Sequence, residues 1–204
     1  SKLRYAFGGL HRIADYNLTP TLNALAKNIQ KTDEDNPAGK RHILLSKYRH
    51  AVTGFNFNRN YPFNVILRTS THAVIDRDNL SAAVHIPHLN TEIDLLNVQR
   101  LPYFRLIVSL GAVSDLKCDG NGIYAPVVEE MHGISQTVTG EWIPAESVLT
   151  EQTMEVKLNE RYILLLTDDV SLVVSMAVEF GKVGFTGEPQ AVKYAGSGKV
   201  LVCG

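Results

Sequence analysis

Residues 103–113 read YFRLIVSLGAV, a run rich in aromatic and β-branched side chains. Such residues pack well on a pleated surface, so the run predicts a long β-strand. It leads toward Asp119-Gly120-Asn121-Gly122, whose glycines supply the positive φ that a tight turn requires. A strand followed by a tight turn is typical of antiparallel pairing.

The same strand-and-turn pattern continues on both sides of this run. Apolar residues alternate with polar ones, and Gly, Pro, Asp or Asn separate the segments. No helical pattern lies between the segments, which favours an antiparallel sandwich over a parallel α/β sheet. Besides residues 103–113, strands are predicted at residues 65–69, 72–75, 82–86, 123–128, 134–143, 153–158, 162–166, 170–180, 190–194 and 199–202.

Two amphipathic helices are predicted before the strands. Thr19 is a good N-cap and Pro20 suits the first helical position, and an apolar stripe then recurs at helical spacing. A second helix is predicted over residues 40–52, after a polar loop that contains Pro37 and Gly39. The apolar stripes of the two helices consist of Leu22, Leu25, Ala26 and Ile29, and of Leu44, Leu45, Tyr48 and Val52.

The chain therefore divides into residues 1–61, a basic helical segment, and residues 62–204, an antiparallel β-sandwich. Between them, Phe55, Phe57, Tyr61 and Phe63 alternate with polar residues or proline. This alternation predicts an extended connector that places aromatic rings in a core. Composition agrees with one folded domain, since 45% of the residues are hydrophobic and 20% are charged. No run approaches the roughly 18 apolar residues of a membrane-spanning helix.

Charge is sorted along the chain. Residues 1–68 carry eleven basic and four acidic side chains, a net charge of +7, whereas residues 69–204 carry nine and seventeen, a net charge of -8. Such an asymmetry bears on association with charged partners and makes the first third the favoured face for an anionic partner. The candidate partner-binding residues are Lys27, Lys31, Lys40, Arg41, Lys47, Arg49 and Arg59.

Two uses of this basic surface follow from its chemistry. It can dock on the acidic part of another protein or of a second copy, and a head-to-tail contact of that kind generates rings or filaments. Alternatively it can neutralise the phosphates of a nucleic acid. A solvated surface without a partner is the plain structural explanation of the same residues.

Metal binding has one candidate pair, His85 and His88, the only histidines at a ligand-like spacing. Residues three apart in a strand face opposite sides, so joint binding of a metal requires a kink at Pro87. Ordinary histidines at a strand end are the alternative. Cys118 and Cys203 are 85 residues apart, which fits two unpaired cysteines better than a metal site or a disulfide.

Catalytic motifs are not recognisable. The segment Gly196-Ser197-Gly198-Lys199 has part of a phosphate-binding loop, but Val200 follows the lysine and no helix can follow, so a tight turn before the last strand is predicted. No nucleophile has an identifiable partner group. The sequence therefore predicts a protein that is not an enzyme and has no cofactor. Carbohydrate or metal-dependent binding by sandwich loops is a further alternative, with Trp142 as the lone tryptophan for stacking on a sugar.

Three segments carry a resemblance to a known family. They are RDNLSAAVHIPHLN at residues 77–90, LPYFRLIVSLGAV at residues 101–113, and the C-terminal residues 171–204. With Gly8-Gly9 and Asn36-Pro37 they resemble a family of uncharacterised bacterial proteins defined by a domain of unknown function. The resemblance implies a helical start, an immunoglobulin-like β body and a protein without catalytic activity.

The function predicted from the sequence is thus a non-catalytic interaction or structural module that self-assembles through charge complementarity. Nucleic-acid binding by the basic segment is the alternative. No apolar signal-peptide region follows the basic residues at the start, which favours the cytoplasm and leaves export open.

Overall fold

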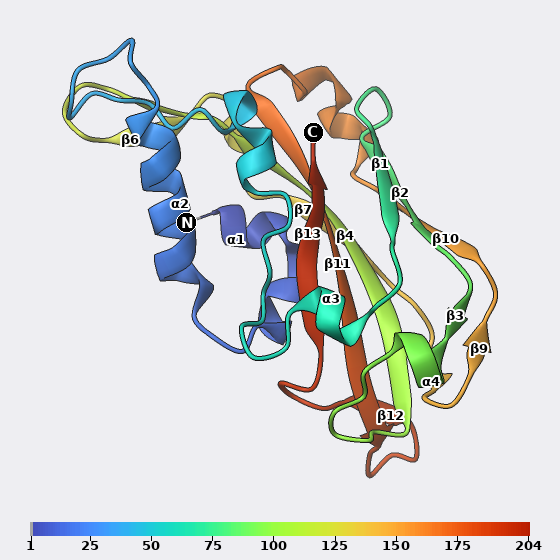
Figure 1. Ribbon diagram of the computed structural model, residues 1–204. Helices are drawn as coiled ribbons and strands as arrows, with labels where there is room; N and C mark the ends of the chain where they lie inside the picture. The colour runs from blue at the N-terminus through green and yellow to red at the C-terminus, as the bar shows by residue number, and fades with distance from the viewer. Residues whose placement is uncertain (1) are drawn as a thin grey trace.

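The computed structural model describes residues 2–204, and it shows three layers (Figure 1). Over those residues the middle layer is a six-stranded antiparallel sheet, flanked by N-terminal helical segments on one face and by a three-stranded sheet on the other. The middle sheet consists of β4 (Tyr103–Ser114), β7 (Ser135–Thr139), β8 (Ile143–Pro144), β11 (Val170–Val183), β12 (Pro189–Ala191) and β13 (Ser197–Cys203).

The outer layers and the connections are shorter elements. The N-terminal layer consists of α1 (Leu3–Ala6), η1 (Gly8–Ile13), α2 (Leu18–Lys31), η2 (Leu45–Lys47) and η3 (Arg49–Ala51), where η denotes a 3₁₀ helix. The three-stranded sheet consists of β1 (His72–Asp76), β2 (Ser81–Ile86) and β10 (Gln152–Lys157). The remaining elements are α3 (Phe63–Ile66), β3 (Leu89–Asn90), α4 (Thr91–Asp94), β5 (Leu116–Cys118), β6 (Tyr124–Pro126), η4 (Glu129–Met131), β9 (Val148–Leu149) and η5 (Glu160–Leu165).

The long strands β4 and β11 form the centre of the fold. Their antiparallel ladder runs from the pair Val170 and Ser114 to the pair Gly181 and Tyr103. Strands β7 and β8 pair with the other edge of β4, and β13 and β12 pair with the other edge of β11. All these pairings are antiparallel, so the prediction of a mainly β protein with antiparallel sheets is confirmed.

Burial on both faces explains why β4 and β11 are apolar along most of their length. Alternate side chains point to opposite faces of a strand. Phe104 and Val108 of β4 pack with Leu172 and Met176 of β11 in a core that the three-stranded sheet covers. Their neighbours on the opposite face, such as Ile107 and Val113 in β4 and Val173 and Ala177 in β11, belong to a second core under the N-terminal layer.

The connector of residues 54–57 covers the free edge of β13. The amide of Phe57 donates to the carbonyl of Gly198 at 2.8 Å, and the amide of Val200 donates to the carbonyl of Phe55 at 2.9 Å. Phe57 is fully buried, and its ring centroid lies 5.0 Å from that of Phe7. Residues 55–57 are therefore extended as predicted, and they protect an edge that would otherwise expose unpaired backbone groups. The rest of the predicted connector differs, because Tyr61 is 45% exposed and Phe63 begins α3.

The first predicted helix is confirmed, although its start differs. Helix α2 begins at Leu18, and its N-cap is Asn17, whose side chain accepts from the amide of Thr19 at 3.0 Å. Leu22 and Ile29 are buried as the apolar stripe predicts. The apolar stripe thus predicted the helix correctly. The N-cap is Asn17 rather than Thr19, because Asn is at least as good a cap as Thr.

The second predicted helix is wrong. Residues 40–52 contain only the short 3₁₀ turns η2 and η3. Ile43 exchanges backbone hydrogen bonds of 2.9 Å with Leu116 of β5, and the carboxylate of Asp115 accepts from the amide of Ser46 at 2.8 Å. These tertiary bonds take amides and carbonyls that an α-helix would need, so packing on the sheet overrides the helical spacing.

Two predicted strands are also helical turns. Residues 63–66 form α3, after which Leu67 makes an isolated bridge to Leu95. Residues 160–165 form η5, and Asn159 caps this turn by accepting from the amide of Arg161 at 3.0 Å. Short apolar runs do not distinguish strands from buried turns by periodicity alone.

Candidate functional site

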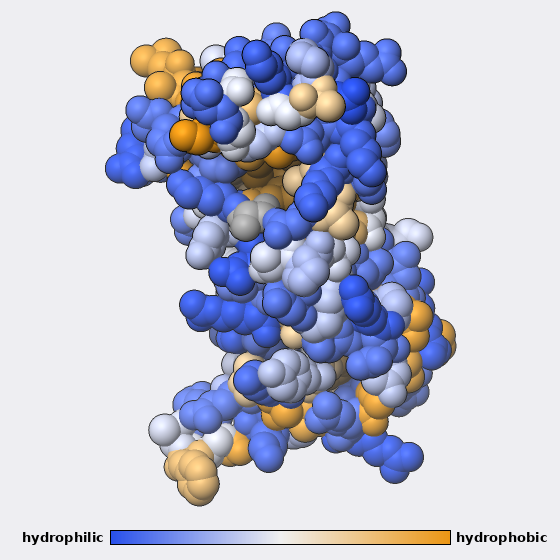
Figure 2. Space-filling model, turned by 90° about the vertical axis from the view of Figure 1, so that its left-hand side faces the viewer, coloured by the Kyte–Doolittle hydropathy of each residue, from blue (hydrophilic) through white to orange (hydrophobic). Residues whose placement is uncertain are grey.

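An apolar pocket opens between α2 and the end of β4. It has a volume of about 90 Å³, and about 480 Å³ of empty space when its mouth is included. Figure 2, which views the molecule from the side of the N-terminal layer, shows a hollow with a hydrophobic floor in a mostly hydrophilic face. The pocket is lined by Lys2, Leu3, Leu25, Ala26, Ile29, Ile43, Leu45, Val113, Ser114, Leu116 and His132.

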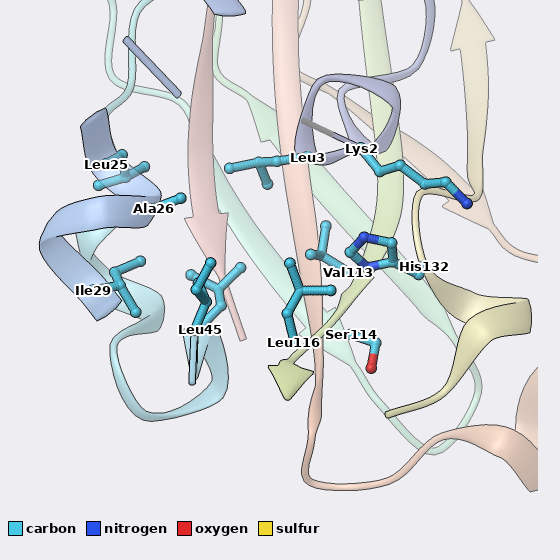
Figure 3. Close-up of a pocket in the computed structure, with 11 residues that line it drawn as sticks. Lys2, Leu3, Leu25, Ala26, Ile29, Leu45, Val113, Ser114, Leu116 and His132 are labelled. Atoms are coloured by element: carbon cyan, nitrogen blue, oxygen red, sulfur yellow. The ribbon is translucent and has the colours of Figure 1, made fainter. Parts of the chain in front are cut away.

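The lining side chains come from segments far apart in the chain. Leu25, Ala26 and Ile29 project from α2, while Val113 and Leu116 face them from the end of β4 and from β5 (Figure 3). The accessible surface of the pocket is almost entirely carbon. A pocket of this chemistry favours an alkyl or aromatic group, because burial removes apolar surface from water on both sides.

Polar groups lie at the rim. The Lys2 stem lines the pocket, but its ammonium donates to a carboxylate oxygen of Glu129 at 3.2 Å, and Figure 3 shows it directed away from the apolar side chains. This ion pair offsets the charge of Lys2 at the rim. Lys27 and Lys117 are exposed but do not line the pocket, and Lys117 points to the face of β5 opposite to Leu116.

His132 lies at the same rim and is half-buried. Burial lowers the pKa of its imidazole, and the positive charge of Lys2 lowers it further. Within residues 2–204 its Nδ1 atom is buried without a hydrogen-bond partner. The lowered pKa favours a neutral imidazole at pH 7, so this side chain adds no charge to the edge of the pocket.

Four of the seven predicted partner-binding residues are free at the surface. Across residues 2–204, the side chains of Lys27, Lys31, Lys40 and Lys47 make no hydrogen bond or ion pair, and all four are exposed. An exposed lysine retains its hydration and its mobility, so it is available to a negatively charged partner. The four lysines come from α2, from the loop before residue 41 and from η2.

The three arginines of the predicted set hold the fold together. Arg41 donates to the carbonyl of Lys31 at 3.2 Å, at the C-terminus of α2 where carbonyls lack helical partners. Arg49 donates to the carbonyl of Asp168 at 2.9 Å. The guanidinium of Arg59 stacks 4.0 Å from the ring centroid of Tyr16. Their charges are therefore committed to contacts inside the chain.

The two candidate metal ligands do not form a cluster. His85 points outward from β2, where its Nε2 lies 3.6 Å from a carboxylate oxygen of Glu151, and His88 is exposed beyond Pro87. In the described part of the chain, no group of three or more His, Cys, Asp or Glu side chains is close enough to hold a metal ion.

Two other features of the sequence, residues 196–199 and Trp142, take part in contacts that belong to the fold. Ser197, Gly198 and Lys199 belong to β13, so the tight turn predicted at residues 196–199 is wrong. The chain turns earlier, at Tyr194, whose φ is +62°. The guanidinium of Arg105 lies 4.3 Å from the ring centroid of Trp142 and also pairs with Glu179 at 2.6 Å. The Trp142 ring therefore already stacks with a side chain of the same protein.

Sequence reasoning found α2 but missed the pocket. Leu25 and Ile29 were predicted to face a core, and only the fold reveals that Leu3, Leu116 and His132 leave a gap beside them. No local signal marks such a gap, because it depends on how distant segments pack.

No protein-family model and no curated protein matches this chain. In residues 2–204 no helix has both the length and the apolar character to cross a membrane. The function is therefore inferred from the geometry of the pocket and of its charged surroundings.

Proposed function

We propose that this chain is a non-catalytic interaction module that binds an apolar side chain of a protein partner in the pocket between α2 and β4. The observation that carries the proposal is a carbon-lined pocket that opens on the basic N-terminal layer. Protein interfaces commonly place one apolar anchor in such a pocket and surround it with polar contacts.

The partner carries negative charge. Residues 1–68 have a net charge of +7 and supply seven of the eleven lining side chains. Exposed Lys27 and Lys31 lie on the solvent side of α2, the helix whose other side lines the pocket. Positive charge on this layer raises the association rate with an acidic partner and discriminates against a basic one.

Xenon, which binds apolar cavities, tests the capacity of the pocket. Under xenon pressure, NMR methyl shifts of Leu25, Ile29 and Leu116 are expected to change in a saturable way. Ala26→Leu fills the pocket and should abolish these changes, whereas Ala24→Leu, on the exposed side of the same helix, should leave them intact. Equal shifts in both variants, or none in the unmodified protein, would contradict the proposal.

Nucleic-acid binding is the second candidate, favoured by the four unpaired lysines. Labelled single- and double-stranded oligonucleotides at about 50 mM salt provide the test, since phosphate contacts weaken steeply as salt rises. Replacement of Lys27, Lys31, Lys40 and Lys47 by Gln should then abolish binding. Lack of binding at low salt removes this candidate.

Three further features that the sequence predicts are included in this proposal. They are the immunoglobulin-like character of the β body, the resemblance to the family of uncharacterised bacterial proteins, and self-assembly through charge. Sugar or metal-dependent binding by sandwich loops also stays a prediction, although Arg105 already stacks on Trp142.

A further inference from the structure

The turn between β5 and β6 projects from the body of the protein. It consists of residues 119–123, and in Figure 1 it forms a yellow-green tip beside the blue loop that follows α2. Asn121 and Gly122 are exposed, and Ile123 is 66% exposed although it is apolar. Water therefore reaches both the backbone and the side chains of this turn.

Asn121 is followed by glycine, and this order favours a reaction within the chain. The amide nitrogen of the residue after an asparagine can attack the carbonyl carbon of the asparagine side chain and close a five-membered ring. A side chain on that residue hinders the attack, whereas Gly122 has none. Asn121-Gly122 is the only Asn-Gly pair in the sequence.

The structure leaves the attacking nitrogen free. Among residues 2–204 the amide of Gly122 finds no hydrogen-bond acceptor. The amides on either side of it, those of Asn121 and Ile123, donate to a carboxylate oxygen of Asp119 at 2.7 and 3.2 Å. The nitrogen of Gly122 can therefore lose its proton and attack without first breaking a hydrogen bond.

Asp119 also precedes a glycine and is the competitor for the same chemistry. Its carboxyl group must be protonated to react, because a carboxylate is a poor electrophile. The hydrogen bond from the amide of Asn121 is the main cause that lowers the pKa of Asp119. Asp119 therefore stays ionised at neutral pH, which leaves Asn121 as the reactive residue of the turn.

We infer that Asn121 is a site of spontaneous deamidation that adds a negative charge to this turn. The nitrogen of Gly122 forms a bond to Cγ of Asn121, the bond between Cγ and Nδ2 breaks, and ammonia leaves with the proton that the nitrogen gave up. Water then opens the cyclic imide at either carbonyl, which gives aspartate or isoaspartate at residue 121. The net change is one water taken up, one ammonia released and one new carboxylate.

The modified turn adjoins the basic N-terminal layer. The thiol of Cys118 donates to the carbonyl of Gly39 at 3.6 Å, and a Cβ atom added at Gly120 would lie 3.8 Å from Cε of Lys40. Lys40 is one of the four lysines that make no ion pair in the described residues. Deamidation thus reduces the positive charge of the region in which this lysine lies.

Incubation of the folded protein at neutral and at mildly alkaline pH, followed by ion-exchange chromatography and peptide mass spectrometry, tests the inference. One more acidic form should accumulate with first-order kinetics. Its rate should rise in proportion to the hydroxide concentration, because the attacking nitrogen must lose its proton. The modified peptide should carry aspartate and isoaspartate at residue 121.

Two variants locate the reaction. Asn121→Gln should abolish the acidic form, because the longer side chain closes a six-membered ring far more slowly. Asn79→Gln is the matched control and should leave the rate unchanged. Asn79 is also exposed in a turn between strands, but Leu80 follows it and its side chain donates to a carboxylate oxygen of Asp76 at 2.7 Å.

Two outcomes would overturn the inference. One is a folded protein that keeps the amide of Asn121 over a period in which the denatured chain loses it, since the turn would then hold the nitrogen of Gly122 out of reach. The other is an acidic form that persists in Asn121→Gln, which would place the reaction at another residue. Both outcomes leave the proposed function standing, because the reaction does not involve the pocket.

Discussion

Gly111 lies directly against the backbone of Ala6. A Cβ atom added at Gly111 would come within 2.0 Å of the Ala6 carbonyl oxygen and within 2.6 Å of the Ala6 Cα. The N-terminal layer therefore approaches β4 so closely at this point that only a glycine fits beneath it. The seating of the whole layer, and with it the floor of the pocket, depends on this contact.

Gly111→Ala is accordingly expected to destabilise the protein by about 1–3 kcal/mol, because backbone rather than a flexible side chain must move. Urea denaturation followed by circular dichroism measures the change. Gly9→Ala is the matched control, since an added Cβ there meets no atom within 4 Å. Equal stability of the two variants would show that Ala6 does not pack tightly against Gly111.

His132 is expected to make stability fall on acidification. Its pKa is lowered in the folded state, so the folded protein binds fewer protons than the unfolded chain below the ordinary pKa of about 6.5. The contribution of the neutral imidazole is complete above that pH and is lost as pH falls through the window between the two pKa values.

His132→Phe should reduce the loss of stability between pH 7.5 and pH 5, and it also removes a buried Nδ1 atom that lacks a partner. Denaturation at both pH values checks this, with exposed His88→Phe as the control. An unchanged pH dependence in His132→Phe would exclude this histidine as its source.

Arg49 and Lys47 should contribute very differently to the stability of the fold, although both were predicted to contact a partner. Arg49 bonds the carbonyls of Asp168 and Val170 and the hydroxyl of Ser171, and thereby fastens η3 to the start of β11. Arg49→Ala should cost about 1–2 kcal/mol of stability, as expected for charged hydrogen bonds that are partly exposed. Lys47→Ala should change stability by less than about 0.5 kcal/mol. Thermal and urea denaturation of both variants distinguish these roles.

The strands that local pattern determines were predictable. Residues 72–76 and 81–86 alternate and are joined by a turn in which Asp76 accepts from the Asn79 amide at 3.1 Å, so their hairpin follows from the sequence. The long strands β4 and β11 were also found, because apolar residues fill them on both faces.

The elements that distant contacts determine were not predictable. Residues 40–52 have helical spacing, yet Leu116 and Asp115 bind the backbone of Ile43 and Ser46 instead. The pocket was even less predictable, since it exists only where α2 and the end of β4 do not fill the space between them. Of the predicted basic surface, the sequence could not separate lysines that face water from arginines that bond the chain.

The two cysteines are expected to react very differently with thiol reagents. Both are free thiols; Cys118 is half-buried in β5, whereas Cys203 is buried in β13. Burial raises the pKa of the Cys203 thiol to about 12, so almost none of the reactive thiolate is present at pH 8. A colorimetric titration of the folded protein should show one thiol that reacts promptly and one that is protected, and addition of denaturant should release the second. Cys118→Ser should remove the prompt phase alone; prompt labelling of Cys203 in that variant would mean that β13 opens readily from the sheet edge.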